Sequence, residues 1–259
     1  MFGWFRNRRR RKLLAAPFPP EWSAVLEANM WQYARLPEPE RARLRDRLRV
    51  FVDEKNFEGC GGLELTDEVR VTVAAYASLL ILELDPESYD HVVSILVYPD
   101  DYVARQTART KEGFEREELS HRMGEAWSMG TVILSWADLL RRRRGSNVAL
   151  HEFAHQLDML NYDVDGTPPL RDGAAIDRWR EVMRAEYDRL AAAVDRGRRT
   201  PLNPYAATNL GEFFAVATEH FFEKPIALHR RRPELYATLA GYYHQDPANW
   251  TERTDQSST

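Results

Sequence analysis

Two histidines and a glutamate stand at positions that permit metal-assisted hydrolysis. Residues 151–155 read H-E-x-x-H, with His151 and His155 four positions apart. Side chains four residues apart project from the same face of a helix, so both imidazoles can bind one zinc ion. Glu152 follows the first of these histidines and can serve as the general base for a water activated by that ion. The motif therefore predicts hydrolysis at a single zinc centre.

The residues around this motif predict the helix that must carry it. Ser146 and Asn147 offer an N-cap immediately before the motif. Apolar residues follow at helical spacing and predict a buried, amphipathic helix: Val148, Leu150, Phe153, Ala154, Leu157 and Leu160. The alternative is a surface helix that merely contains two histidines, and the apolar content argues against it.

A catalytic zinc ion usually has three protein ligands, so the motif requires a third. The metzincin extension is excluded because Asp158 and Asn161 occupy the positions where that subclass has glycine and histidine. A later apolar segment, GEFFAVATEHFF, contains Glu212 and Glu219 on one helical face. A carboxylate in such a helix is costly unless it is paired or coordinated. Either glutamate could therefore be the ligand while the other supports a ligand.

The remaining pattern predicts an α+β fold. Residues 91–98 and 130–136 are the clearest strands, and 57–62 is a turn-rich break. Helices are predicted from residue 20 and over residues 37–55, 69–84, 174–194, 210–223 and 233–244. Pro225 is expected to end the helix at 210–223. This pattern predicts a small mixed sheet packed on helices, together with a metal-binding helix and a mostly helical C-terminal half. We expect one domain over 17–250, flanked by a flexible basic tail at 1–16 and a disordered tail at 251–259.

Composition narrows the class of protein further. The chain has 259 residues and a net charge of -4, so bulk charge does not predict direct binding of nucleic acid. Cys60 is the single cysteine, which excludes an internal disulfide and a thiolate zinc site and suits the reducing cytoplasm. No apolar run is long enough to cross a membrane.

The N-terminal segment combines aromatic and basic residues. Phe2, Trp4 and Phe5 precede five arginines and Lys12 within the first twelve residues. A solvated tail is the favoured interpretation. The alternative is weak contact with an anionic membrane surface, with aromatic side chains inserted and arginines on the headgroups.

Three segments resemble the Mlc titration factor A family of bacterial zinc peptidases. They read FEGCGGLELTDEVRVTVAAYASLL, VALHEFAHQLDMLN followed by DGTPPL, and NPYAATNLGEFFAVATEHFF, and together they span residues 57–222. The resemblance implies a zincin-like metallopeptidase domain with one Zn²⁺ per chain, held by His151, His155 and Glu212. It implies Glu152 as catalytic base and Tyr205 as a hydrogen-bond donor to the transition state. The basic start of this chain is expected to depart from the family.

The same resemblance implies a cytoplasmic enzyme with aminopeptidase-type activity that acts on small peptides and binds a repressor of sugar uptake. A second hypothesis is a regulatory protein that sequesters a transcription factor, with a zinc site that is mainly structural or vestigial. The intact Glu152 favours the enzyme, because a structural site has no need of a base. Both functions can hold in one protein.

Four features of the sequence each allow two interpretations. Asp158 and Glu219 either orient an imidazole of the site or face away from it. The strand at 130–136 is either an edge that pairs with extended substrate or a plain core strand. Residues 161–172 have the spacing of a calcium-binding loop, but Pro168 and Pro169 interrupt it, so a turn-rich loop that shapes the cleft is favoured.

Overall fold

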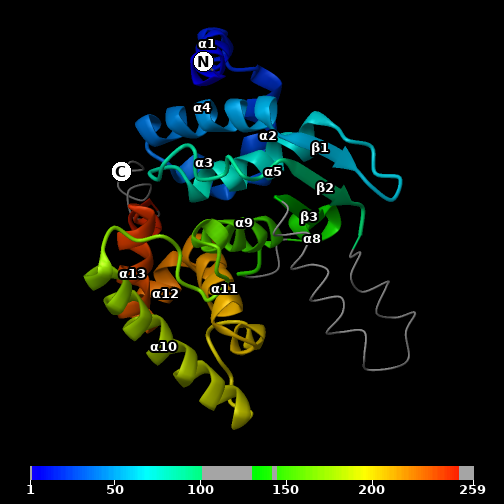
Figure 1. Cartoon of the computed structure of the whole chain (residues 1–259). Coiled ribbons are helices and arrows are strands. Elements are labelled where there is room, and N and C mark those ends of the chain that lie inside the picture. Colours follow the sequence, from blue (N-terminus) through cyan, green and yellow to red (C-terminus); the bar gives the residue numbers. More distant parts are fainter. Residues whose placement is uncertain (1, 101–129, 142–144, 251–259) are drawn as a thin grey trace, which may run out of the picture.

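A three-stranded parallel sheet lies between two groups of helices (Figure 1). The computed structural model describes residues 2–100, 130–141 and 145–250. The strands are β1 (Asn56–Gly59), β2 (Ser94–Tyr98) and β3 (Thr131–Ser135), in the order β1-β2-β3. Ile95 of the central strand pairs with Phe57 on one side and Val132 on the other. The short sheet and the helices around it confirm the predicted α+β class.

Most of the described chain is helical. The N-terminal half contains α1 (Phe2–Ala15), α2 (Pro20–Asn29), α3 (Trp31–Arg35), α4 (Glu38–Glu54) and α5 (Asp67–Leu80). After the sheet come α8 (Trp136–Leu140), α9 (Val148–Asp158), α10 (Gly173–Asp195), α11 (Leu210–Glu223), α12 (Pro225–Arg231) and α13 (Pro233–Tyr243). Two 3₁₀ turns, η1 (Met159–Asn161) and η2 (Pro204–Ala207), flank α10.

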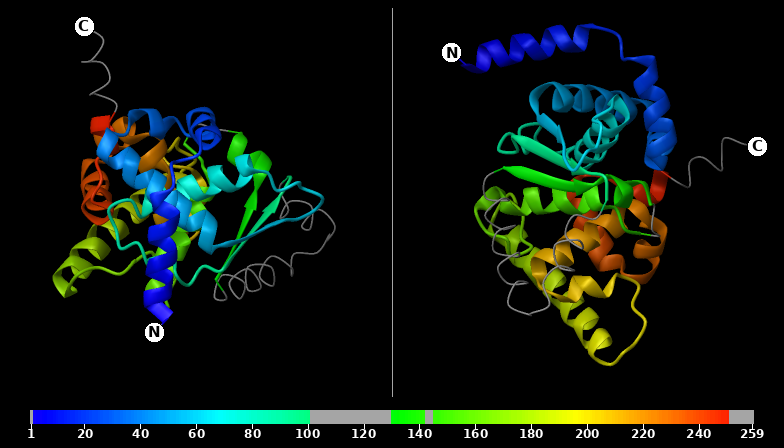
Figure 2. Two further views of the ribbon diagram at one scale, coloured as in Figure 1. Left: turned by 90° about the horizontal axis from the view of Figure 1, so that it is seen from above. Right: turned by 90° about the vertical axis from the view of Figure 1, so that its right-hand side faces the viewer.

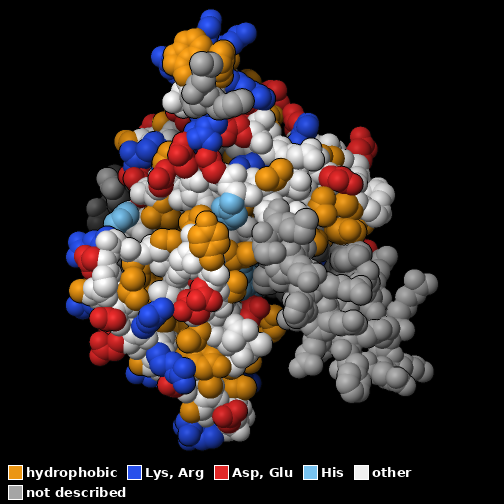
Figure 3. Space-filling model, in the orientation of Figure 1, with side chains coloured by type: hydrophobic (Ala, Val, Ile, Leu, Met, Phe, Trp, Pro, Cys, Tyr) orange, Lys and Arg blue, Asp and Glu red, His pale blue; other side chains and the backbone are white. Residues whose placement is uncertain are grey.

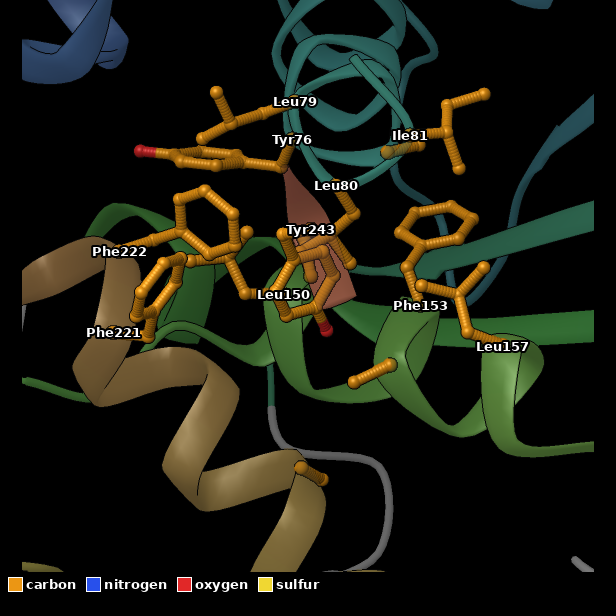
Figure 4. Packing of buried hydrophobic residues seen from close by; sticks show 14 of the residues in the cluster. Tyr76, Leu79, Leu80, Ile81, Leu150, Phe153, Leu157, Phe221, Phe222 and Tyr243 are labelled. Atoms are coloured by element: carbon orange, nitrogen blue, oxygen red, sulfur yellow. The ribbon is translucent and has the colours of Figure 1, made fainter. Parts of the chain in front are cut away.

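The core lies between α5 and α9. Thr66 is the N-cap of α5, and its hydroxyl accepts a hydrogen bond from the Val69 amide. The apolar face of α9 points toward α5, and the aromatic residues of α11 and α13 close the side of this layer (Figure 4). Phe153 and Leu157 on α9 are fully buried there, and the Tyr89 hydroxyl donates to the Phe153 carbonyl at 3.0 Å. This packing holds α9 rigidly, with its polar face turned toward α11.

One prediction about the sheet was wrong. Residues 57–59, predicted as part of a turn-rich break, belong to strand β1 because β2 supplies a parallel hydrogen-bonding partner. Helix α11 ends at Glu223, just before Pro225, as predicted, and Pro225 then occupies the first turn of α12, where its missing N–H leaves no hydrogen bond unmade. The sequence also predicts two or three further short strands between residues 98 and 130, and this prediction falls on residues 101–129, outside the described part of the chain.

The basic N-terminus is a helix where the sequence predicted a flexible tail. Helix α1 lies on α4 at the end of the molecule farthest from α10 (Figures 1 and 2). Arg9 and Arg10 make ion pairs with Asp53 and Glu54 of α4. These contacts give the segment a partner that its composition did not reveal. The tail predicted at 251–259 lies outside the described residues, and no helix in the described part is long and apolar enough to span a membrane.

Candidate metal centre

Helix α9 presents two imidazoles to one point. Its N-cap is Asn147, whose side-chain oxygen accepts from the Leu150 amide at 3.1 Å, as predicted. The rings of His151 and His155 lie 4.8 Å apart between centroids, and their Nε2 atoms are separated by 3.2 Å. His155 is buried and His151 is partly buried. The two nitrogens therefore converge on one small volume beside the helix.

Glu212 brings a carboxylate oxygen to the same volume from α11. The N-cap of that helix is Asn209, whose side chain accepts from the Glu212 amide at 2.8 Å and fixes the first turn. Glu212 Oε2 lies 3.0 Å from His151 Nε2 and 3.6 Å from His155 Nε2. The three ligand atoms lie within 4.8 Å of one another. No other cluster of this kind occurs among the histidine, cysteine and acidic residues that the structure describes.

These separations fit a single metal ion. Ligand atoms bound tetrahedrally to zinc at roughly 2.0–2.2 Å lie about 3.3–3.5 Å from each other. The observed separations of 3.0, 3.2 and 3.6 Å bracket that value. The Nε2 atoms of both histidines and one carboxylate oxygen of the buried Glu212 therefore face one another at separations typical of zinc ligands. Two imidazoles and a carboxylate are a donor set that suits zinc.

Glu219 lies about two turns further along α11 and contacts the outer side of His151. Its Oε1 is 2.8 Å from His151 Nδ1, and its Oε2 accepts from the Asn147 amide at 2.5 Å. A carboxylate on Nδ1 favours the tautomer that carries a proton there, which leaves Nε2 as the metal-facing atom. The geometry thus separates the two glutamates that the sequence could not distinguish: Glu212 meets both imidazoles, whereas Glu219 contacts one from behind.

The electrostatics of the centre favour a positive charge. Burial lowers the pKa of His151, but its hydrogen bonds to Glu212 and Glu219 outweigh burial and raise that pKa to about 10. Burial raises the pKa of Glu212, yet its hydrogen bonds with His151 and His155 lower it overall. Two carboxylates therefore stabilise a cation between them. A proton on His151 compensates part of the negative charge of these carboxylates, and a divalent ion compensates more of it.

Glu152 is the neighbour of His151 on α9, and its carboxylate makes no hydrogen bond to the candidate ligands. Its side chain is partly buried on α9, and burial raises its pKa. No hydrogen bond or ion pair to another described residue holds its carboxylate. The charges of both histidines and of Glu212 and Glu219 act on it, which places it within the electrostatic reach of the centre. A carboxylate with a raised pKa next to a metal site has the properties of a general base.

Tyr205 also lies beside the centre. Turn η2 positions it, because Asn203 Oδ1 accepts from the Tyr205 amide at 3.1 Å and fixes the turn. Its ring is 6.2 Å from that of His151, and its side chain is 52% exposed. A tyrosine that is close to the ligands and open to solvent can reach a bound molecule. The sequence predicted this residue through family resemblance and not through spacing.

Asp158 connects the end of α9 to the loop that follows. The side chain is fully buried, and its Oδ2 accepts from the Gly166 amide at 2.8 Å. Burial raises its pKa to about 6. Gly166 has a φ of +76°, and a Cβ there would lie 2.4 Å from the Leu210 carbonyl oxygen at the start of α11. Asp158 therefore fixes the loop against α11, and a role in orienting an imidazole stays a prediction.

The loop over residues 161–172 uses its polar side chains to form turns. The Asn161 side chain donates to the Thr167 carbonyl at 2.7 Å, and Asp165 accepts from the Thr167 amide at 2.9 Å. Asp172 caps α10 by accepting from the Ala175 amide. These contacts are those of a turn-rich loop, the interpretation that the sequence favoured over a calcium site.

The sequence did not predict Glu223, a residue that supports the start of α9. Glu223 Oε1 accepts from the Asn147 side chain at 3.0 Å and from Gln32 at 3.1 Å, while its Oε2 accepts from the Trp31 indole at 3.0 Å. The cap of α9, the end of α11 and the start of α3 thus meet at one carboxylate. The signal available in the sequence was the spacing, since Glu223 follows Glu219 by four residues on the same helical face.

The fold and the site together define a zincin-like metallopeptidase domain. Helix α9, which carries both histidines, lies next to strand β3, and a glutamate from a later helix completes a group that could hold a metal ion. A family model described as glucose-regulated metallo-peptidase M90 matches residues 4–244. The chain belongs to this family. Because the match begins at residue 4, the expectation that the basic start departs from the family was wrong.

Similar proteins cover nearly the whole chain. The uncharacterized protein slr2042 of Synechocystis is 40% identical over 244 residues, which are 92% of this chain and 89% of that protein. Mlc titration factor A of Yersinia pestis is 30% identical over 261 residues, covering 98% of this chain and 93% of that protein. The same figures hold for Mlc titration factor A of Yersinia pseudotuberculosis. The resemblance predicted from the three sequence segments is confirmed.

Proposed function

We propose that this protein is a zinc-dependent peptidase that cleaves small peptides by an aminopeptidase-type reaction in the cytoplasm. The observation that carries the proposal is the convergence of His151, His155 and Glu212 on one point, with Glu152 beside them. The family to which the chain belongs supports metallopeptidase chemistry. The zinc ion follows from the donor set, since imidazole and carboxylate ligands in a three-residue site with an open position are typical of catalytic zinc.

In this proposal the ligands are His151, His155 and Glu212. When bound there, the ion supplies a Lewis acid that lowers the pKa of a water molecule and polarises the peptide carbonyl. Glu219 keeps the proton on His151 Nδ1, so that Nε2 remains available to the ion. Asn147 and Glu223 hold Glu219 and the start of α9 in register.

Glu152 moves the proton that hydrolysis requires. Its carboxylate takes a proton from the attacking water and later delivers it to the amine of the leaving group. The raised pKa of Glu152 suits both steps, because a carboxyl that holds its proton too weakly cannot return it. Tyr205 donates a hydrogen bond from its phenol to the oxygen that becomes negative during the attack. Its exposed ring beside His151 supports this role.

A second candidate function is binding of a repressor-type transcription factor. The name of the Yersinia relatives, Mlc titration factor A, favours a regulatory partner of that kind. In the strongest form of this alternative, the zinc site is structural and the protein acts by sequestration alone. Glu152, whose carboxylate has no bonded partner among the described residues, supports the enzymatic proposal over a purely structural zinc site, because a structural site needs no base. The proposal includes no direct contact with nucleic acid.

Metal content and turnover, measured on the same preparation, test the proposal. The purified protein should contain about one zinc ion per chain and should release the chromophore from a panel of aminoacyl and short peptide substrates. Removal of the ion with a chelator should abolish turnover, and one equivalent of zinc should restore it. A protein that contains zinc but cleaves no member of the panel would favour the regulatory alternative.

A further inference from the structure

Helix α1 sorts its basic side chains onto two faces. Arg6, Arg9 and Arg10 point toward the body of the protein and are paired with carboxylates. Arg10 makes two bonds of 2.6 Å to Glu54, and Arg9 lies 2.8 Å from Asp53. Arg6 pairs with Glu87 and Asp90 in the segment before β2. The positions i, i+3 and i+4 share one helical face, so this face is the one that docks.

The opposite face is exposed and carries both charge and aromatic surface. We call it the outer face of α1, and it consists of Trp4, Phe5, Arg8, Arg11 and Lys12. Trp4 is 56% exposed and Phe5 is 59% exposed, with their rings edge to face at 5.1 Å. Arg8 lies over the Trp4 ring at 5.6 Å. None of the three cations pairs with a carboxylate in the described part of the chain. Figure 3 shows hydrophobic side chains at the tip of the molecule, with Lys and Arg side chains around them.

The charge is divided unevenly between the N-terminal segment, which is basic, and the rest of the chain, which is acidic. Residues 1–16 contain six basic side chains and no carboxylate. The rest of the chain then has 30 basic and 40 acidic residues, a formal charge of -10. An anionic surface therefore attracts α1 and repels the remainder of the protein. Helix α1 lies at the end of the molecule opposite α10 and protrudes from it in both further views (Figure 2).

We propose that the outer face of α1 binds the surface of an anionic phospholipid bilayer. Tryptophan and other aromatic residues are enriched at the boundary between headgroups and acyl chains, and Trp4 and Phe5 lie exposed in the first turn of α1. Arg8, Arg11 and Lys12 follow within two turns, where they meet anionic headgroups as the tip inserts. Nucleic acid would attract the same cations, but the exposed aromatic pair gains more by leaving water for a lipid interface. This inference is independent of the metal centre and of its chemistry.

Co-sedimentation of the full chain with vesicles tests the proposal. The protein should bind vesicles that contain about 30 mol% phosphatidylserine in phosphatidylcholine, and bind pure phosphatidylcholine at least about tenfold more weakly. Binding should weaken when salt is raised from about 0.1 M to about 0.5 M, because the headgroup attraction is screened. Double-stranded DNA and single-stranded RNA serve as competing probes.

Two variants and one matched control separate the parts of the outer face. Trp4→Ala/Phe5→Ala and Arg8→Glu/Arg11→Glu/Lys12→Glu should each lose at least about tenfold in vesicle affinity, while the docked arginines keep α1 in place. Arg230→Glu/Arg231→Glu, which changes two exposed cations on α12, should bind as the parent does. Circular dichroism and thermal unfolding should be unchanged in all three variants, since every altered side chain is exposed.

Four results would overturn the inference. They are absence of vesicle binding by the parent, equal binding to neutral vesicles, an equal loss in the Arg230→Glu/Arg231→Glu control, and binding of nucleic acid in preference to vesicles through the same residues. The last result would assign the outer face to a nucleic-acid partner. Peptidase activity enters none of these measurements, so failure of the proposed enzymatic function would leave the test intact.

Discussion

The metal centre and the contact between α1 and α4 both pair carboxylates with cationic groups, yet they do so in opposite surroundings. At the centre, His151 meets Glu212 and Glu219 at 3.0 and 2.8 Å, with side chains that are at most 14% exposed. At α1, Arg9 meets Asp53 at 2.8 Å, but the arginine side chain is 65% exposed. The distances are alike and the surroundings differ.

This difference shows which pairs have functional consequences. Exposed ion pairs contribute little, because water and salt screen them and two long side chains must be ordered. Buried carboxylates are costly unless a cation and hydrogen bonds compensate them. Glu212 and Glu219 are held in a buried site by a helix cap and a backbone amide, which is an arrangement that stabilises a bound metal. The pairs at α1 hold a helix against its neighbour, whereas the pairs at the centre surround a candidate metal site.

The largest effect should come from removing the ligand carboxylate. Glu212→Ala should lower zinc affinity by about 10³-fold, because a total binding free energy of roughly 10–16 kcal/mol is shared among three or four ligands. The matched variant Glu219→Gln should lose only about 10–100-fold, since it disturbs a partner of His151 and not a ligand. Competition with a fluorescent chelator measures both affinities. Full zinc retention by Glu212→Ala, together with loss in Glu219→Ala, would reverse the two assignments.

Tyr205→Phe should lower kcat by roughly 10²–10³-fold with little change in KM or zinc content. The phenol is proposed to meet the oxyanion once it forms, so its loss weakens binding of the transition state and not of the substrate. Steady-state kinetics on a chromogenic substrate measure the split. A raised KM with unchanged kcat would make Tyr205 a substrate-contacting residue, and unchanged kinetics would remove it from the mechanism.

Zinc affinity should fall by about tenfold for each unit of pH between 8 and 6, roughly 100-fold in total. The sign follows from His151, whose pKa is raised to about 10 by Glu212 and Glu219 against the effect of burial. Below that pKa the imidazole carries a proton that the ion must displace, so acid opposes binding. Calorimetry in two buffers of different ionisation enthalpy should show release of about one proton at neutral pH. Affinity that is independent of pH over this range would contradict the electrostatic description of the centre.

The smallest effect should come from the α1 contact. Arg9→Ala removes an ion pair that is as short as those of the centre, yet it should leave the midpoint of thermal unfolding nearly unchanged. Differential scanning calorimetry at low and high salt measures this, with the parent protein as reference. A large loss of stability that salt does not alter would show that exposure fails to distinguish the two regions.

The sequence predicted the parts of the molecule in which local pattern and burial agree. The motif helix, its Asn147 cap, helix α11 and the strands around Ile95 and Val132 all have periodic apolar residues and clear end signals. The spacing of the H-E-x-x-H motif made His151 and His155 candidates, and the cost of placing a carboxylate in an apolar helix made the two glutamates of α11 candidates.

What the sequence could not predict depends on contacts between distant segments. Glu212 and Glu219 share a helical face, so the sequence could not tell them apart. The structure does, because Glu212 meets Nε2 of both histidines whereas Glu219 contacts only Nδ1 of His151. Strand β1 exists because β2 pairs with it, and α1 has partners on α4 that lie more than forty residues away. Local composition carries no information about such partners. Glu223 was missed for the same reason, since its role requires Asn147 and Gln32.

The variant Glu152→Gln tests the central claim most directly. Glutamine has the shape of glutamate but cannot accept a proton from the attacking water, so zinc content and fold should match the parent. Turnover should fall by roughly 10²–10⁴-fold, the contribution of a positioned general base. The measurement is kcat/KM on a chromogenic peptide substrate at known zinc occupancy. Turnover at the parental rate by a fully zinc-loaded Glu152→Gln protein would contradict the account.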